Sequence, residues 1–239
     1  MARIIIFASS KGGTGKTLVV ANLGVAMAQL GHKVTLLDAD ITMANLSIVL
    51  GLGRQQTTLH EVLAGEARLS KAIYNGPHGV RVVPSGISLS GVQRVRLDRL
   101  KKVVDELARK SEFLLIDAPS GLGRDAVVAI TMAQEMVLVV TPDIASLSNA
   151  LRTKIIAERF GVKPAGVIVT RTTGGHVDIP VDEIASTLEL PVIATIPEDP
   201  EVRRSVAFGE PVVTFRSGSP AAREFKKLAA ALVKARPAS

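Results

Sequence analysis

The chain has 239 residues, of which 47% are hydrophobic, a length and composition that suit one α/β domain with a large core and exclude a disordered protein. It contains no cysteine, which excludes disulfides, thiolate metal sites, iron–sulfur clusters and cysteine nucleophiles. The formal net charge of +7 fits a solvated basic surface, or else a nucleic acid or an anionic membrane as partner.

Apolar runs that are typical of buried strands alternate with helical patterns along the whole chain. The predicted strands cover residues 4–8, 33–37, 79–84, 113–116, 136–140, 165–169 and 192–196. The predicted helices cover residues 18–28, 43–50, 58–63, 97–109, 143–160, 180–188, 200–207 and 221–233. This alternation predicts a single α/β domain over residues 1–239, with a mostly parallel twisted sheet and helices on both faces. Ligands of such sheets bind at the carboxyl ends of the strands.

A glycine-rich stretch, Lys11-Gly12-Gly13-Thr14-Gly15-Lys16-Thr17, lies between the first predicted strand and the first predicted helix. Glycines let successive backbone N–H groups curl around an anion, and the start of the helix adds further donors. In such a phosphate-binding loop Lys16 reaches the terminal phosphates and the Thr17 hydroxyl ligates Mg²⁺. The alternative is a turn that only joins strand to helix, but a lysine at a helix start is unfavourable unless an anion is bound.

Three aspartates follow two other predicted strands. Asp117 comes after four apolar residues, as a Walker B aspartate does, and is expected to contact Mg²⁺ through water. The backbone near Gly121 is then placed to sense the γ-phosphate. Asp38 and Asp40 are two residues apart, so an extended chain puts both side chains on one side. One can hold the metal's water shell while the other positions a water for attack; ordinary acidic turns are the alternative.

Together these motifs resemble those of the MinD/ParA family of ATPases with a deviant Walker A loop. Residues 11–17 resemble that loop, and Asp38-Ala39-Asp40-Ile41-Thr42-Met43-Ala44-Asn45-Leu46 with Leu50-Gly51 resembles the second motif of the MinD branch. Residues 115–122 resemble the MinD switch II. Residues 196–203 and 209–212 resemble the family's adenine-proximal segment, so the similarity spans almost the whole chain.

The resemblance implies a P-loop NTPase that dimerises face to face around two ATP molecules and hydrolyses ATP slowly unless a regulatory partner protein stimulates it. Lys11 then reaches the phosphates of the partner subunit, Lys16 serves its own subunit, and Asp40 positions the attacking water. The implied metal-shell residues are Thr17, Asp38 and Asp117. The implied nucleotide contacts, for ATP or ADP, are Lys11, Gly12, Gly13, Thr14, Gly15, Lys16, Thr17, Leu18, Thr170, Arg171, Pro197, Glu198 and Asp199.

Three positions depart from the family pattern. Ser10 replaces a glycine, and Leu18 stands where many members have a second threonine, so a contact to the α-phosphate is lost. Thr170 precedes Arg171 where an asparagine commonly recognises adenine. A threonine cannot pair with a base in bidentate fashion as an amide can, so the base specificity of this chain is open.

The last predicted helix carries an apolar stripe with Phe225, Leu228 and Leu232 beside several lysines. Such a stripe can lie on an anionic membrane, or it can pack on the sheet as the last core helix, which is the simpler interpretation. The N-terminal apolar run is too short for a signal peptide, and no run reaches transmembrane length. We therefore expect a cytoplasmic protein, peripheral at the inner face of the membrane in the first case.

The leading functional prediction is a MinD-like ATPase, an ATP-dependent dimer switch that governs the position of the division site or of polar structures. A ParA-like partition ATPase that binds DNA non-specifically is the main alternative. The basic charge favours that alternative, whereas the Asn45-Leu46 pair opposes it. A flagellar-number regulator of the same branch and a nucleotide-bound scaffold with little turnover are further alternatives.

Overall fold

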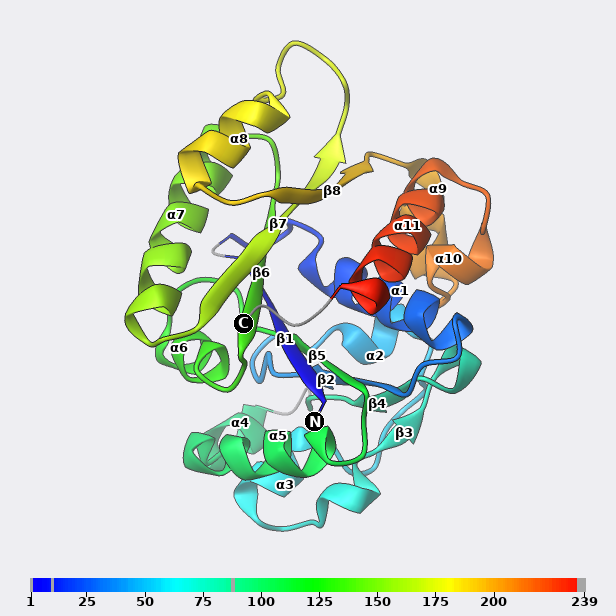
Figure 1. Ribbon diagram of the computed structural model, residues 1–239. Helices are drawn as coiled ribbons and strands as arrows, with labels where there is room; N and C mark the ends of the chain where they lie inside the picture. The colour runs from blue at the N-terminus through cyan, green and yellow to red at the C-terminus, as the bar shows by residue number, and fades with distance from the viewer. Residues whose placement is uncertain (1, 10, 87–88, 236–239) are drawn as a thin grey trace.

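A computed structural model describes residues 2–9, 11–86 and 89–235. This part of the chain forms one eight-stranded sheet with the order β3-β4-β2-β5-β1-β6-β7-β8 (Figure 1). The β3–β4 pair is antiparallel and every other neighbouring pair is parallel. The strands are β1 (Arg3–Ala8), β2 (Val34–Asp38), β3 (Tyr74–Asn75), β4 (Arg81–Val83), β5 (Phe113–Asp117), β6 (Glu135–Val140), β7 (Lys163–Thr172) and β8 (Val192–Pro197).

Helices cover both faces of the sheet, which explains why the central strands are apolar at nearly every position. One face carries α1 (Lys16–Gln29), α2 (Leu46–Val49), α9 (Pro200–Ala207), α10 (Val212–Phe215) and α11 (Pro220–Lys234). The other face carries α3 (Leu59–Ala64), α4 (Leu89–Arg94), α5 (Leu100–Ala108), α6 (Arg124–Ile130), α7 (Ile144–Arg159) and α8 (Val181–Leu188). The predicted α/β fold with a mostly parallel sheet is confirmed.

The first strand occupies the point at which the direction of the chain across the sheet reverses. β1 lies between β5 and β6, so β2 and β4 follow on one side of it and β7 and β8 on the other. In open parallel sheets the crevice at such a reversal is the usual place for a ligand. The glycine-rich loop, which follows β1, therefore lies at the centre of the carboxyl edge of the sheet.

The C-terminal helix α11 lies beside α1 in the core (Figure 1). Its stripe of Phe225, Leu228 and Leu232 is buried, as the prediction of a core helix required. Arg3 also holds the carboxyl end of α11. The Arg3 guanidinium donates to the Leu232 carbonyl at 2.8 Å and pairs with Glu135 through two hydrogen bonds of 2.8 Å. Among the described residues no helix is long and apolar enough to span a membrane.

Several elements differ from the sequence prediction. The helix expected over residues 43–50 is reduced to α2, because the Asp40 side chain holds the residues before it in a turn. The helix expected over residues 97–109 begins as a 3-10 turn before α5, and β7 extends beyond the predicted 165–169 at both ends. The elements β3, α4, α6 and α10 were not predicted, since they span only two to seven residues and show no full apolar repeat.

Candidate functional site

The glycine-rich loop joins β1 to α1, and Ser10, which directly precedes it, lies outside the described residues. Gly13 and Gly15 have φ angles of +84° and +83°, which glycine adopts without strain. Within the described part of the chain no side chain caps the start of α1, and its first turn holds no acidic residue, an arrangement that favours an anion there. The hydroxyl oxygens of Ser9 and Thr14 are buried, and no described residue bonds them. Buried polar atoms are ordinarily bonded, so these two orphans fit a ligand site.

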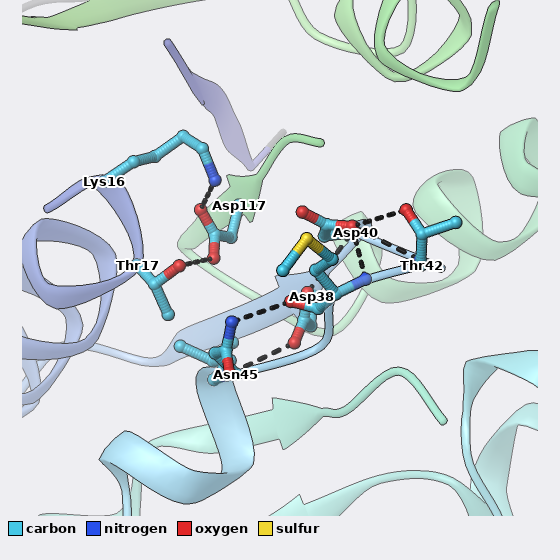
Figure 2. A network of polar contacts seen from close by, with 9 residues as sticks. Lys16, Thr17, Asp38, Asp40, Thr42, Asn45 and Asp117 are labelled. Atoms are coloured by element: carbon cyan, nitrogen blue, oxygen red, sulfur yellow. Dashed lines mark hydrogen bonds and ion pairs between the residues drawn. The ribbon is translucent and has the colours of Figure 1, made fainter. Parts of the chain in front are cut away.

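The first residues of α1 meet the end of β5 beneath this loop (Figure 2). Lys16 Nζ lies 2.5 Å from Asp117 Oδ1, and the Thr17 hydroxyl donates to Asp117 Oδ2 at 2.6 Å. Lys16 is 5% exposed and Asp117 is 1% exposed, so this ion pair is almost fully removed from water. Such a charge-assisted network holds both side chains in one place.

The other two predicted carboxylates follow β2 (Figure 2). Asp38, the register partner of Asp117 on the neighbouring strand, accepts from the Leu46 N–H at 3.1 Å and from the Asp40 N–H at 3.2 Å. Asp40 accepts from the Met43 N–H at 2.9 Å and from the backbone and hydroxyl of Thr42. The two aspartates therefore shape the segment between β2 and α2, and they leave negative charge beside the loop.

The site holds more buried negative charge than positive charge. Burial, together with the neighbouring Asp117 carboxylate, raises the pKa of Asp38 well above its ordinary value. A divalent cation would relieve this repulsion, and hydroxyl and carboxylate oxygens are the donors that Mg²⁺ prefers. The described residues contain no cluster of three or more His, Cys, Asp or Glu arranged to hold a metal by themselves.

Two adjoining cavities lie at this edge of the sheet. A cavity of 360 Å³ is lined by Gly12, Gly13, Thr14, Gly15, Lys16, Thr17, Leu18, Asp40 and Arg171, among others. The second, of 470 Å³, shares Thr14, Gly15, Leu18 and Arg171 with the first and extends to Thr170, Pro197, Glu198 and Asp199. Its remaining walls are largely apolar. The structure thus brings the predicted loop residues from Gly12 onward and the predicted C-terminal residues around two adjoining cavities. Asp117 contacts Lys16 and Thr17 of this lining, whereas Asp38 and Asp117 themselves line neither cavity.

At the end of β7, Thr170 differs from the sequence expectation of a contact to the base, whereas Arg171 lines both cavities. Thr170 is buried, and its hydroxyl lies 2.6 Å from the Thr14 carbonyl and 3.0 Å from the Val140 carbonyl. Arg171 has a φ of +56°, where a non-glycine residue is strained, and sits at a bulge between β7 and β8. The Arg171 Nε lies 3.9 Å from Glu198 Oε2.

The Asp199 carboxylate accepts hydrogen bonds from backbone N–H groups of two helices. One of its oxygens accepts from the Glu201 N–H at 2.9 Å and caps α9, and the other accepts from the Ala221 N–H at 3.0 Å in α11. Burial alone would raise the pKa of Asp199, but these hydrogen bonds outweigh it and lower that pKa below its ordinary value. The predicted nucleotide contact of Asp199 stays a prediction, and its evident role is to fix α9 along the second cavity.

Lys11 lies apart from the buried cluster, at the outer side of the loop. Its ammonium is 3.7 Å from Asp143 Oδ1, and the two side chains are 49% and 42% exposed. The Asp143 carboxylate is already engaged, because it accepts from the Thr141 hydroxyl and from the Ser146 N–H that it caps. Lys11 is therefore held weakly within its own chain.

A family model matches residues 5–212 of this chain, and its description is the CobQ/CobB/MinD/ParA nucleotide binding domain. The chain belongs to this family. An uncharacterized ATP-binding protein of Methanocaldococcus jannaschii is 44% identical over 236 residues, which cover 99% of this chain and 89% of that protein. The predicted membership in the MinD/ParA family is thereby confirmed.

Solved structures of the MinD branch share the fold of this family member over nearly its whole length. The cell division ATPase MinD of Pyrococcus furiosus matches with a TM-score of 0.94 and 40% identity, over 98% of this chain and 99% of that one. MinD of Pyrococcus horikoshii, complexed with Mg-ADP, matches with a TM-score of 0.93 and 38% identity over 98% and 97%. MinD of Aquifex aeolicus, in a complex with MinC, matches with a TM-score of 0.88 and 29% identity over 100% and 99%.

Two buried polar residues around this nucleotide-binding site were missed in the sequence. His60 Nε2 in α3 lies 2.9 Å from the carbonyl of Ile41, the residue that follows Asp40. Asn22 in α1 accepts from the Val213 N–H and donates to the Leu18 carbonyl, which ties α10 to the helix of the loop. The only signal was a polar residue inside an apolar helical pattern, and that pattern does not reveal the distant partner.

Proposed function

We propose that this chain is a MinD-like ATPase that binds ATP with Mg²⁺ at the glycine-rich loop and hydrolyses it to ADP and phosphate. The observation that carries the proposal is the buried Lys16–Asp117–Thr17 cluster beneath an uncapped helix start, with Asp40 lining the same cavity. The likeness to MinD structures at 38–40% identity supports it, one of them in complex with Mg-ADP.

In this proposal different residues bind the phosphates, hold the metal and position the attacking water. The loop N–H groups and Lys16 bind the phosphates, and Thr17, Asp38 and Asp117 hold the metal and its waters, which neutralises phosphate charge. Asp40 orients the attacking water by accepting its hydrogen bond, since its carboxylate lines the loop cavity. The base and ribose occupy the second cavity, between Leu18 and the segment Pro197 to Asp199.

Turnover in this proposal requires a second copy of the chain. Lys11 is half exposed and its ion pair with Asp143 is long, so little holds it back from the phosphates of a facing subunit. A lysine supplied in this way would stabilise negative charge in the transition state, as an arginine finger does. An isolated subunit lacks this charge in its own site, so turnover is slow until dimerisation or a regulatory partner completes the site.

The cellular role that fits this mechanism is an ATP-dependent switch in spatial positioning, at a division site or at polar structures. The complex of the Aquifex aeolicus MinD with MinC supports a regulatory protein partner. A peripheral membrane position remains part of the proposal. The α11 stripe does not support it, because its apolar residues are buried in the core.

The net charge of +7 favours a second candidate, a ParA-like ATPase whose ATP-bound dimer binds DNA through its basic surface. Such binding depends steeply on salt, because each phosphate contact releases counterions. Retardation of random-sequence DNA that needs ATP and disappears at raised salt would favour this candidate over the MinD-like role.

One assay tests the proposal and separates the candidates. Steady-state phosphate release is measured with ATP and Mg²⁺, alone and with anionic vesicles or DNA. The proposal expects hydrolysis that depends on Mg²⁺. The rate of hydrolysis per subunit should rise with protein concentration as dimers form. A chain that binds Mg-ATP without measurable turnover under any of these conditions would instead be a nucleotide-bound scaffold, and a chain that does not bind Mg-ATP would refute the ATPase assignment.

A further inference from the structure

Thr170 stands where the sequence suggested a contact to the base, yet its hydroxyl contacts the phosphate-binding loop. It follows Val169, which pairs with Val140 on the neighbouring strand β6. Its Oγ1 lies 2.6 Å from the Thr14 carbonyl and 3.0 Å from the Val140 carbonyl, and the residue is 4% exposed. A hydroxyl has one proton to donate, so this proton is committed to backbone oxygens and is unavailable to a base.

The Thr14 carbonyl belongs to a peptide whose orientation matters for an anion. A trans peptide is planar, so its C=O and N–H point in opposite directions, and the described chain has no cis peptide bond. Because the Thr14 carbonyl points to the end of β7, the Gly15 N–H points away from the end of β7. Gly15 lines both cavities, whereas Thr170 lines only the cavity of 470 Å³.

This peptide is also flanked by a residue that tolerates its turning over. Rotation of the Thr14–Gly15 peptide changes the ψ of Thr14 and the φ of Gly15 in opposite directions, and glycine populates positive and negative φ about equally. Gly13, on the other side of Thr14, has the same freedom, and an added Cβ at either glycine would meet no atom within 4 Å. No side-chain cap holds Gly15 at the start of α1.

We propose that Thr170 is a positioning residue that locks the Thr14–Gly15 peptide with its N–H toward the bound phosphates. The proposal rests on the proposed function, because it concerns the same nucleotide site. It reassigns Thr170 from the base to the phosphate loop. Loss of its hydroxyl therefore weakens every ligand that carries phosphates, whatever the base.

The test compares Thr170→Val, which keeps the shape and removes the hydroxyl, with Thr170→Ser, which keeps the hydroxyl. Thr153→Val is the matched control, since Thr153 is equally buried and donates to the Asn149 carbonyl in α7, outside both cavities. Affinities for ATP, GTP and inorganic tripolyphosphate are measured with Mg²⁺, by calorimetry or by competition with a fluorescent nucleotide. Thermal unfolding shows that each variant is folded.

We expect Thr170→Val to bind all three ligands about tenfold more weakly, the equivalent of one well-placed hydrogen bond. The ratio of the ATP and GTP affinities should change by less than about twofold, and Thr170→Ser should stay within about threefold of the parent. Thr153→Val should lower the unfolding temperature without changing any of the affinities. Should Thr170→Val not fold, Thr170→Ala removes the same hydroxyl without placing a methyl group against two carbonyls.

Two results would overturn the proposal while leaving the ATPase assignment intact. The first is a changed ratio of ATP to GTP affinity with unchanged tripolyphosphate binding, which would make Thr170 a base contact. The second is unchanged affinity for all three ligands in folded Thr170→Val, which would leave its hydroxyl a purely structural role. If the parent protein bound neither ATP nor tripolyphosphate, the proposed function itself would fail.

Discussion

Lys11 and Lys16 belong to the same loop but lie in opposite surroundings. Lys16 is 5% exposed and lies 2.5 Å from Asp117, whereas Lys11 is 49% exposed and lies 3.7 Å from a half-exposed Asp143. A buried charge with a short ion pair is fixed in place before a ligand arrives, and an exposed charge with a long ion pair is free to leave. The difference is what the proposed function requires, in which Lys16 serves the site of its own chain and Lys11 that of a facing chain.

The largest effect is expected from Lys16→Ala, which removes the buried lysine of this pair. ATP binding should weaken at least about 100-fold, because charge-assisted hydrogen bonds to phosphates are lost. Asp117 would also be left buried without its partner, so the free energy of unfolding should fall by about 3 kcal/mol. Calorimetry and thermal unfolding measure the two effects, and Lys101→Ala, which removes an exposed lysine paired with Asp105, is the control. Tight ATP binding by folded Lys16→Ala would contradict the role.

Asp40→Asn separates ATP binding from ATP hydrolysis in the buried part of the site. The amide oxygen can still accept from Thr42 and Met43, so the turn before α2 should persist while the negative charge is lost. We expect ATP affinity within about threefold of the parent and turnover reduced at least about 100-fold. Single-turnover hydrolysis with saturating ATP measures this directly. Undiminished turnover would remove Asp40 from the mechanism.

Lys11→Ala tests whether the exposed lysine acts on a facing subunit. Its ion pair with Asp143 lies at the surface, so the free energy of unfolding should change by less than about 0.5 kcal/mol. ATP binding to the monomer should be retained, whereas hydrolysis at high protein concentration should fall at least about tenfold. Loss of ATP binding by the monomer would instead place Lys11 in the site of its own chain.

The smallest effect is expected at Asp199, which supports the wall of the second cavity through α9 and α11. Asp199→Asn keeps one acceptor oxygen of two, and the free energy of unfolding at neutral pH should fall by about 1 kcal/mol. The folded-state pKa of Asp199 is lowered, so the stabilisation is fully present above pH about 4 and is lost as the pH falls through that lower pKa. Denaturant unfolding at several pH values should show the two proteins converging in acid. A constant difference would contradict the assignment.

The sequence was most informative where a local pattern and a backbone rule coincide. The central strands were predictable because helices bury them on both faces, and the loop was predictable because its glycines and Lys16-Thr17 stand between a strand and a helix. The carboxyl ends of β2 and β5 then placed Asp38 and Asp117 beside it. These features depend on residues that are adjacent in the sequence and on the order of the strands in the sheet.

Contacts between distant segments were not predictable in the same way. The hydrogen bond from Thr170 to Thr14 joins residues 156 positions apart, and no pattern in the chain reveals that its hydroxyl faces the loop. The contact between His60 and Ile41, and the hydrogen bonds of Asp199 to the first turns of two helices, are of the same kind. Residues 43–45 were predicted as helix but lie before α2, because the hydrogen bonds of one side chain overrode the helical pattern.

Mixing two inactive variants tests most directly whether the two lysines serve different subunits. In a mixed dimer of Lys11→Ala and Asp40→Asn, the site of the Lys11→Ala subunit keeps its own Asp40 and receives Lys11 from its partner. Random pairing makes half of the dimers mixed, and each has one intact site, so an equimolar mixture should recover about a quarter of the parent's ATP hydrolysis. If Lys11 acted within its own chain, neither subunit would hold a complete site. The mixture would then be as inactive as either variant alone, and the central claim would be wrong.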